Sequence, residues 1–425
     1  MSTISWAALA CLPRVGMSSG KPLFWSFFGQ SGDTDGSNDG DGTGARRKNG
    51  YDKETEEHAQ WTTSDWIQKH KYELETHNVS TVDGYHLTLQ RMPRPGCRPV
   101  LLVHGLLTSS LSWVIMGPGK SLAFLLFEKS YDVWLANLRG SIYGRNHTRL
   151  TVKDADFWSF SFHEMGAYDL PAIIDHVRNE SSFHQVLLIG HSQALNAFLV
   201  LCTLQPEYNE RILFMQALAP ILELRNFTKF NNDDVRRISK FLKAKIKSQS
   251  YEVFPEGYLQ QKCVKSNADA RKECSEVQKK FLGSGQYNRS LEPIIYGKLI
   301  QGGSLKEIQH LQQIWKSGDF VSFDYGAEGN LNYYNTVNPI IYDLKKLTVP
   351  LVLYFGDTDA FATPGGVHRI YSRLLSTVIG VYHISAQKFN HLDFLCASDV
   401  KSLVNNKLIE TMENYLTAKL KYIIE

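Results

Sequence analysis

The sequence predicts an α/β fold in which a mainly parallel central sheet is interrupted by a mostly helical insertion. From Val100 to Leu218, short apolar segments typical of buried strands alternate with helical segments. Residues 220–338 break this alternation, because they are polar, rich in Lys and Arg, and helical in pattern. Strand-like segments return at Leu347. We therefore expect four parts: a low-complexity, disordered N-terminal segment (1–55), two halves of a core (56–219 and 339–425), and a helical cap (220–338).

The composition excludes several classes of protein. The 425 residues are 43% hydrophobic, which is enough to bury a large core, and the net charge is only +3. No long basic run is interleaved with aromatic residues, so we expect no nucleic-acid partner. No apolar stretch reaches the roughly 18 residues of a transmembrane helix. The chain has no P-loop and no HExxH motif, and we expect no metal and no other cofactor.

The region before residue 100 contains three distinct stretches. Ile4–Leu12 is a short apolar run without a basic flank before it, and it makes a poor signal peptide. Residues 29–50 are rich in Gly, Asp, Ser and Asn, a composition typical of a disordered linker. Residues 72–91 predict a hairpin with its turn at Asp83-Gly84.

A candidate nucleophile lies in the segment Leu187–Leu195. Its apolar residues run into a G-x-S-x-A turn followed by a mostly apolar helical segment, which is the layout of a nucleophile elbow with Ser192 at its tip. Gly190 and Ala194 stand where strand and helix approach closely, and a larger side chain would clash there. The same pattern occurs at Gly119–Ala123, but no apolar strand precedes it. A structural turn serine is the alternative for Ser192.

An acid and a histidine follow two later strands. A serine nucleophile needs a base to take its proton and an acid to orient that base, in the chain order Ser, acid, His for this layout. Residues 349–355 predict a buried strand that is followed by Asp357 and Asp359, and residues 378–384 predict another that is followed by His391. The layout favours Asp359 over Asp357. A loop histidine without a role is the alternative for His391.

Two backbone N–H groups are candidates for stabilising an oxyanion. Residues 99–107 predict a buried strand that ends in a glycine turn, upstream of the elbow. One donor should be Leu106 and the other Gln193, directly after the candidate nucleophile. A plain strand-end turn is the alternative. His104 and His191 flank glycines in apolar surroundings, and we expect them to be scaffold histidines.

Blocks of sequence spread from about Trp61 to the C-terminus carry a family resemblance. They are Thr62-Thr63, Asp83-Gly84-Tyr85, His104–Leu107, Tyr131–Leu135, Phe157–Phe162, Tyr168–Ala172, Phe323–Gly326 and Asn390–Phe394. Together they resemble the acid lipases of the gastric and lysosomal type, within the α/β-hydrolases. The resemblance covers most of the chain and implies an α/β-hydrolase fold.

The resemblance also implies roles for single residues. It places a catalytic triad on Ser192, Asp359 and His391, and the oxyanion donors on Leu106 and Gln193. It implies a serine lipase that hydrolyses carboxylic esters of neutral lipids, triacylglycerol or sterol ester, through an acyl-enzyme, in a secreted or lysosomal protein. A carboxylesterase for smaller esters is the alternative function, and a non-catalytic lipid-binding homologue is a further one.

Three positions after the candidate nucleophile depart from the family pattern. The family has glycine in place of Ala194, and threonines in place of Leu195 and Asn196. Alanine is small enough for the elbow, so we expect activity to survive.

Sequons and cysteines favour the secretory route. Five asparagines begin an N-x-S/T sequon and are candidate glycosylation sites: Asn78, Asn146, Asn179, Asn226 and Asn288. The resemblance implies a disulfide between Cys263 and Cys274, two of the six cysteines. Cys202 follows the elbow in an apolar helical segment, and we expect a buried free thiol there.

One helical segment of the insertion is amphipathic and basic. Apolar residues share one face and basic residues decorate the rest: Val235, Ile238, Phe241, Leu242 and Ile246 against Arg236, Arg237, Lys240, Lys243 and Lys247. Such a helix can lie on a lipid surface. The alternative is a cap helix packed on the core with solvated lysines. Because the insertion lies between nucleophile and acid, we expect it to cover the active site and to meet a lipid interface.

Overall fold

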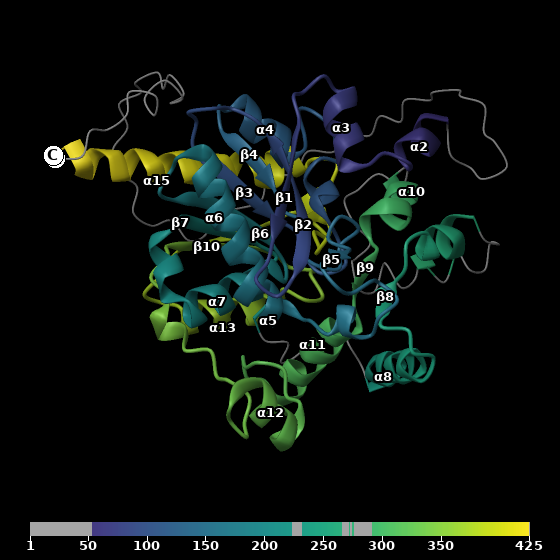
Figure 1. The fold of residues 1–425 in the computed structure, drawn as a ribbon. Helices are drawn as coiled ribbons and strands as arrows, with labels where there is room; N and C mark the ends of the chain where they lie inside the picture. Colours follow the sequence, from purple (N-terminus) through teal and green to yellow (C-terminus); the bar gives the residue numbers. More distant parts are fainter. Residues whose placement is uncertain (1–52, 223–231, 266–271, 273, 276–290, 425) are drawn as a thin grey trace.

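The computed structural model describes residues 53–222, 232–265, 272, 274–275 and 291–424. A nine-stranded sheet has the order β1-β2-β4-β3-β6-β7-β10-β11, with β5 paired to β2 (Figure 1). From β4 to β11 every neighbouring pair is parallel, whereas β2 pairs antiparallel with β1 and β4. The predicted mainly parallel sheet is thereby confirmed. The strands are β1 (Glu75–Ser80), β2 (Tyr85–Met92), β3 (Pro99–Val103), β4 (Asp132–Leu135), β5 (Asn146–His147), β6 (Val186–His191), β7 (Ile212–Leu218), β10 (Leu351–Gly356) and β11 (Val378–Ile384).

The centre of the sheet is covered on both faces, which is why its strands have apolar sequences. Every residue of β3 and β6 is buried. Because β3, β6, β10 and β11 are parallel, the residues that follow them gather at one edge of the sheet. The helices of the core are α2 (Lys53–His58), α3 (Thr63–Lys69), α4 (Leu122–Glu128), α5 (Phe162–Glu164), α6 (Leu170–Ser181), α7 (Ala194–Leu204), α13 (Pro364–Arg373), α14 (Asp393–Cys396) and α15 (Asn406–Ile424).

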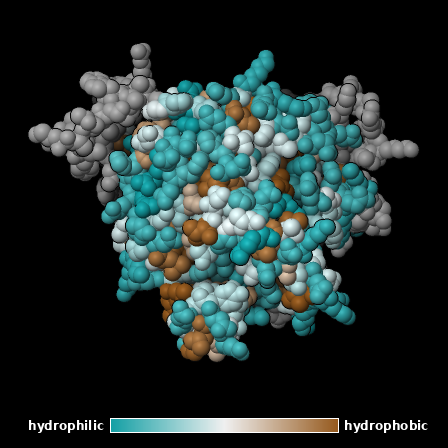
Figure 2. All heavy atoms as spheres, viewed as in Figure 1, coloured by the Kyte–Doolittle hydropathy of each residue, from teal (hydrophilic) through white to brown (hydrophobic). Residues whose placement is uncertain are grey.

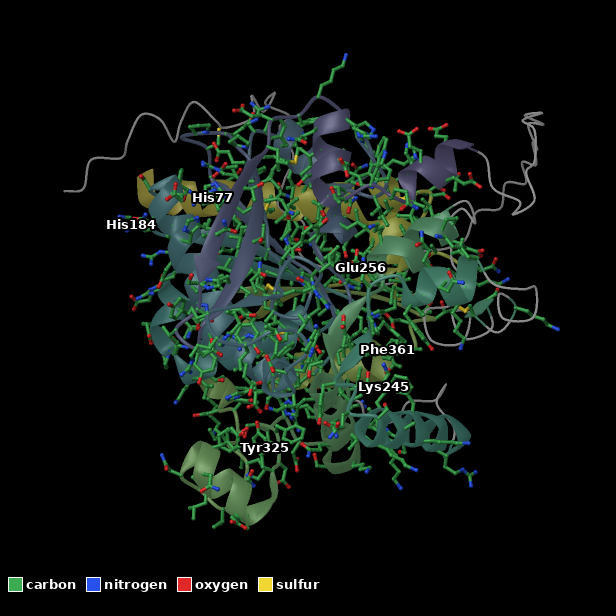
Figure 3. The ribbon with its side chains drawn as sticks, turned by 45° about the vertical axis from the view of Figure 1, so that its right-hand side comes forward. His77, His184, Lys245, Glu256, Tyr325 and Phe361 are labelled. Carbon is green, nitrogen blue, oxygen red and sulfur yellow. A yellow bond between two sulfur atoms is a disulfide. The ribbon has the colours of Figure 1, made fainter. Side chains whose placement is uncertain are left out.

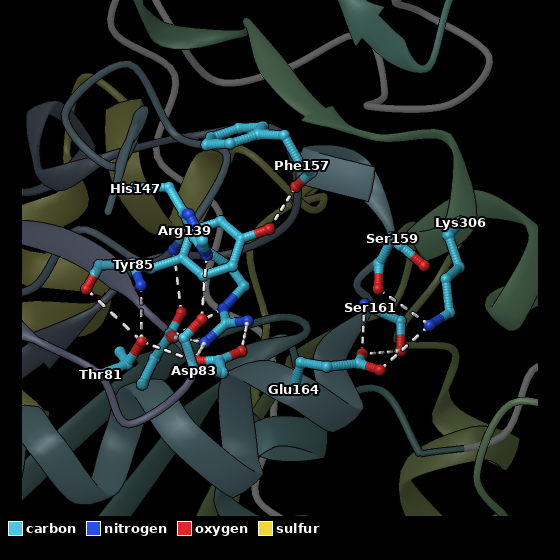
Figure 4. Close-up of polar contacts among 11 residues, drawn as sticks. Thr81, Asp83, Tyr85, Arg139, His147, Phe157, Ser159, Ser161, Glu164 and Lys306 are labelled. Atoms are coloured by element: carbon cyan, nitrogen blue, oxygen red, sulfur yellow. Dashed lines mark hydrogen bonds and ion pairs between the residues drawn. The ribbon is translucent and has the colours of Figure 1, made fainter. Parts of the chain in front are cut away.

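The predicted hairpin forms from β1 and β2, and a buried arginine ties its turn to the core (Figure 4). The Arg139 guanidinium donates to both oxygens of Asp83, at 2.6 and 2.9 Å, and to Asp169 at 2.7 Å. The Tyr85 ring packs on this guanidinium, 4.0 Å from its carbon, and the Tyr85 hydroxyl donates to the Phe157 carbonyl. Removing one partner of such a buried group would leave an uncompensated charge, so the network fixes the turn.

The described part of the insertion is mostly helical. In Figure 1 its elements lie to the right of the sheet and below it, and β8 and β9 form a separate antiparallel pair. They are α8 (Asn232–Lys247), β8 (Glu252–Phe254), α10 (Glu292–Ile294), β9 (Gly302–Ser304), α11 (Leu305–Ser317) and α12 (Gly326–Tyr334), with π-helical turns η5 (Gln260–Val264) and η7 (Ile295–Leu299).

A buried ion pair joins the insertion to the core. The Lys306 ammonium of α11 donates to Glu164 at 3.0 Å and to the Ser159 carbonyl at 3.1 Å (Figure 4). It also donates to the hydroxyl of Tyr325, which precedes α12 (Figure 3). Burial opposes the ionisation of Glu164, but the charges of Lys306 and His163 and the hydrogen bonds from Lys306 and the Ser161 N–H together lower the pKa of Glu164 to about 2. This end of α11 is therefore anchored to the core by charge as well as by packing.

The α8 helix is buried along one part of its apolar face and exposed to solvent along another. Leu242 is buried, whereas Ile246 is 47% exposed beside the exposed Lys243 and Lys247. In Figure 3, Lys245 of α8 lies on the same side of the molecule as Phe361, a residue of the loop after β10. The helix thus packs on the rest of the chain with part of its apolar face and leaves the other part at the surface.

Apolar atoms also reach the surface at the end of the molecule where α12 lies (Figure 2). Leu331 of α12, and Val337 and Ile341 shortly after it, are among the exposed apolar residues. Within the described ranges, no helix is both long enough and apolar enough to cross a bilayer.

Candidate active site

Ser192 stands at the end of β6 in a sharp turn before α7. Its φ of 57° lies in the left-handed region, which is unfavourable for a residue with a side chain. The Ser192 N–H donates to the Leu218 carbonyl of β7 at 2.8 Å, and this bond helps to hold the turn in place. The strained conformation projects the serine from the strand end, as a nucleophile elbow requires.

Small residues make room for this turn. A Cβ built on Gly190 would lie 2.8 Å from the Ala194 Cβ, and one built on Gly105 would lie 3.0 Å from the Ser192 Cβ. The elbow therefore tolerates alanine at position 194 because Gly190 has no side chain. Leu195 and Asn196, the other departures from the family pattern, are both buried.

The structure brings the predicted serine, histidine and acid into one hydrogen-bonded chain. The Ser192 Oγ lies 2.8 Å from Nε2 of His391, and Nδ1 of His391 lies 2.8 Å from Oδ2 of Asp359. All three residues are buried. With the proton on Nδ1 donated to Asp359, Nε2 is free to accept the proton of Ser192.

Asp359 is held in its ionised form, whereas Asp357 is turned elsewhere. Burial alone would raise the pKa of Asp359, but His391 and the backbone N–H groups of Phe361 and Ala362 lower it below its usual value. Those two N–H groups donate to Oδ1 at 2.7 and 2.9 Å. Asp357 is largely exposed and pairs with His383 of β11 at 2.8 Å. Geometry thus separates two acids that the strand layout could only rank.

The two candidate oxyanion donors flank the serine. Leu106 lies in the turn after β3, beside Gly105, whose backbone abuts Ser192. Leu107 has a φ of 58°, so this turn is also in the left-handed region. Gln193 follows Ser192 directly and is buried. The arrangement places two backbone segments beside the serine, as an oxyanion hole requires.

His104 and His191 hold backbone in place. Burial lowers the pKa of His191 to about 3 and that of His104 to about 4, so both are neutral. The His191 Nε2 donates to the His391 carbonyl at 3.0 Å and so supports the loop that carries His391. His104 Nε2 accepts from the Leu138 N–H at 3.0 Å.

Two residues near the site, Glu307 and Phe361, were not predicted from the sequence. The Gln193 side chain donates to Glu307 of α11 at 2.8 Å, and burial raises the pKa of Glu307 to about 7. The Phe361 ring packs on His391 with centroids 5.1 Å apart. The sequence signal at Glu307 is the Ser304-x-x-Glu307 capping pattern. This pattern indicates the start of a helix and does not indicate a contact with the elbow.

Ser121, the serine of the second G-x-S-x-A pattern, has no hydrogen bond to a histidine within the part of the chain that the structure describes. Ser121 precedes α4, and its Oγ accepts from the Met116 N–H at 2.9 Å.

The predicted disulfide joins Cys263 to Cys274, and Cys202 is buried as a free thiol, as expected. Among the described residues no group of three or more His, Cys, Asp or Glu is arranged to hold a metal ion.

The sequons divide between the described and the undescribed parts of the chain. Asn78, Asn146 and Asn179 are exposed, as a glycosylation acceptor must be. Asn226 and Asn288 lie outside the described residues, as do the apolar run 4–12 and the low-complexity residues 29–50.

Family models match most of the chain. A model of the partial α/β-hydrolase lipase region matches residues 63–117, and a model of the α/β hydrolase fold matches residues 98–395. A solved structure of DcsB in complex with its substrate analogue is similar with a TM-score of 0.51. It is 11% identical over 81% of this chain and 99% of its own. That likeness supports the fold alone.

Curated relatives match more than four fifths of the chain. Lipase 1 of Drosophila melanogaster is 38% identical over 81% of this chain and 78% of its own length. Gastric triacylglycerol lipase of Bos taurus is 32% identical over 83% of this chain and 91% of its own length. Lipase member K of Homo sapiens is 29% identical over 86% of this chain and 95% of its own length. These matches confirm the resemblance seen in the sequence: the chain belongs to the acid lipase family of the gastric type, within the α/β-hydrolases.

Proposed function

We propose that the protein is a serine lipase that hydrolyses carboxylic esters of neutral lipids through an acyl-enzyme. The observation that carries this proposal is the buried hydrogen-bonded chain from Ser192 through His391 to Asp359, at the carboxyl edge of the sheet. Membership of the acid lipase family supports the same activity, because its curated relatives include triacylglycerol lipases.

The geometry supports a two-step mechanism. His391 takes the proton of Ser192 as the serine attacks the ester carbonyl, and the N–H groups of Leu106 and Gln193 stabilise the oxyanion. The protonated His391 is stabilised by Asp359 and returns its proton to the departing alcohol. Water, deprotonated by the same histidine, then attacks the acyl carbon, and the histidine gives that proton to the Ser192 Oγ as the bond to the fatty acid breaks.

Replacing the nucleophile tests this mechanism. We expect Ser192→Ala to lower kcat by several orders of magnitude with the fold intact, because acylation needs the Oγ. A fluorophosphonate probe should label the wild-type protein at Ser192 and the variant not at all, as peptide mass spectrometry would show. Ser121→Ala is the matched control and should keep both turnover and labelling. Turnover of Ser192→Ala near the wild-type rate, or a label on Ser121, would refute the assignment.

The insertion supports a preference for long acyl chains. We propose that residues 220–338 form a cap over Ser192, because α11 contacts Gln193 directly and a buried acyl chain needs a covered, dry site. Hydrolysis rates on esters of increasing acyl length, from short carboxylic esters to triacylglycerol and sterol esters, test this preference. A maximum at the shortest esters would identify a carboxylesterase instead.

We further propose that the lipase works at a lipid interface. The exposed Ile246 among the lysines of α8, and the exposed Leu331, Val337 and Ile341 at the α12 end, offer apolar side chains to such a surface. Activity on emulsified triacylglycerol should exceed activity on a monomeric ester. Ile246→Ser should weaken only the former, whereas Leu242→Ser, at a buried position, should destabilise the protein. Equal activity on both substrate forms would contradict an interfacial role.

The covalent features support a secreted or lysosomal location. The Cys263–Cys274 disulfide is stable in an oxidising compartment, and the three described sequon asparagines are exposed. Glycopeptides at Asn78, Asn146 or Asn179 from protein secreted by eukaryotic cells would support this route.

A further inference from the structure

A single short segment of the insertion touches both halves of the candidate oxyanion hole. This support segment, residues 301–307, contains β9 and the first residues of α11. On one side it meets the turn after β3 that carries Leu106, and on the other it meets Gln193 at the elbow. The core strands that carry these two donors come much earlier in the chain, so the contacts are entirely long-range.

The contact with the elbow is made by two side chains. Nε2 of Gln193 donates to Oε1 of Glu307 at 2.8 Å, and both residues are buried. The other oxygen of Glu307 accepts from the Ser304 N–H at 2.7 Å. No hydrogen bond or ion pair from a lysine or arginine to Glu307 is found within the described residues. The raised pKa of Glu307, near 7, reflects this burial without a paired cation, with the carboxylates of Glu164 and Asp169 adding to it.

The contact with the other donor is made by backbone. The Gln301 N–H donates to the Leu107 carbonyl at 2.9 Å, next to Leu106. A Cβ on Gly303 would overlap the Leu107 side chain, so glycine lets the segment lie flat against the turn. The Gly303 N–H donates to the Gly140 carbonyl at 3.1 Å and pins the segment to the core. Leu107 holds a left-handed φ of 58°, a conformation that needs such support.

These contacts can fix the orientation of the backbone N–H groups in the candidate oxyanion hole. An oxyanion hole accelerates a reaction only if its N–H groups already point at the position of the developing charge. The candidate oxyanion donor of Gln193 is its backbone N–H. The Gln193 carbonyl accepts from the Ala197 N–H of α7 at 3.2 Å, and Glu307 holds the side chain from the opposite, insertion side. Ser192, on its other side, is in a strained left-handed conformation, so the peptide between them benefits from an anchor.

We propose that Glu307 is a positioning residue that fixes the backbone N–H of Gln193 in the oxyanion hole by holding its side chain. This inference rests on the proposed function. It makes the support segment part of the catalytic apparatus, so that docking of the insertion and assembly of the oxyanion hole become one event. Glu307 does not touch the substrate in this scheme.

A purely structural role for Glu307 makes a different prediction. Its capping bond to Ser304 stabilises the start of α11 and would do so whatever Gln193 is. Removing Glu307 would then lower stability and disturb the insertion, and its effect on kcat would not depend on the Gln193 side chain. The distinction can therefore be measured by coupling the two residues.

The experiment is a double-mutant cycle on ester hydrolysis with Gln193→Ala, Glu307→Ala and both together. Gln193→Ala keeps the backbone donor and removes only its anchor. Losing a whole donor costs about 10²–10³ in kcat, so we expect roughly tenfold from each single variant, with KM little changed. The double variant should lose no more than either single one, because both break the same link. Gln312→Ala, which removes a bond from α11 to Ser239, is the control and should keep the wild-type kcat.

A boronic acid that forms a tetrahedral adduct on Ser192 provides a second readout. Its affinity should fall by the same factor as kcat in each variant, whereas the affinity of a neutral product-like fatty alcohol should not change. Glu307→Gln should keep most of the wild-type kcat and most of the affinity for the boronic acid, because its amide oxygen can still accept the hydrogen bond from the Gln193 side chain. If Glu307→Ala proves unstable, Gln193→Ala alone carries the test.

The outcomes separate this inference from the proposed function. Multiplicative losses in the double variant, or a wild-type kcat in Gln193→Ala, would overturn the positioning role while leaving a working lipase. A wild-type protein that hydrolyses no ester and takes no fluorophosphonate would overturn the proposed function and this inference with it.

Discussion

Asp359 and Asp357 stand two residues apart in the same loop, yet their side chains face different histidines. Asp359→Asn should be far more damaging than Asp357→Asn. The amide oxygen would take the place of Oδ1, which accepts the backbone N–H groups of Phe361 and Ala362, so the NH2 group would donate to Nδ1 of His391 and favour the wrong tautomer of that ring. Asp357→Asn breaks only an exposed pair with His383, which contributes little. Steady-state kinetics of both variants, with circular dichroism as a check on folding, test this expectation. Equal losses, or the reverse order, would mean that the acid has been misassigned.

Gly190 is the residue that allows alanine at position 194. Gly190→Ala would place a Cβ 2.8 Å from that of Ala194, and we expect it to lower the free energy of unfolding by about 1–3 kcal/mol through overpacking. Adding Ala194→Gly, the residue that the family has there, should restore part of the loss. Denaturant unfolding of the two single variants and the double variant measures this coupling. Strictly additive effects would show that the two Cβ positions do not compete.

At the scale of elements, the start of α11 carries a carboxyl group whose ionisation opposes folding. Burial raises the pKa of Glu307 from 4.5 to about 7, so the folded protein binds its proton more tightly than the unfolded chain. Its favourable contribution to stability is fully present below about pH 4.5 and is lost as the pH rises through 7. Glu307→Gln cannot titrate. The unfolding free energy of this variant, relative to wild type, should therefore rise between pH 4.5 and 7 and level off above. A difference independent of pH would contradict the raised pKa.

Elements with a strong local pattern were predictable, and contacts between distant elements were not. The elbow, the two later strands and the hairpin at Asp83-Gly84 follow from apolar runs and turn residues, which act locally. The choice of Asp359 needed the family resemblance, because both acids follow one strand and only tertiary packing separates them. Glu307 lies 114 residues from Gln193, and nothing local to either residue indicates that they meet.

In the whole molecule, too, the features set by local sequence patterns were predictable and the contacts between distant segments were not. The alternation of strands and helices predicted the sheet and the place where the insertion interrupts it, since buried parallel strands must be apolar. The buried network of Arg139 with Asp83 and Asp169 was invisible in the sequence, because a single Arg or Asp in a loop is normally solvated. These charges can be buried because three distant segments of the chain bring them together as hydrogen-bonded ion pairs.

The chain order of the active site has a consequence for biosynthesis. Ser192 and His391 are 199 residues apart, and the whole insertion is made between them. A growing chain can fold its elbow and both oxyanion donors while the base and its acid are still untranslated. Esterase activity then appears only when synthesis is almost finished. By the same reasoning, a message that stops between codons 192 and 391 yields a product with a nucleophile but without the histidine that would activate it.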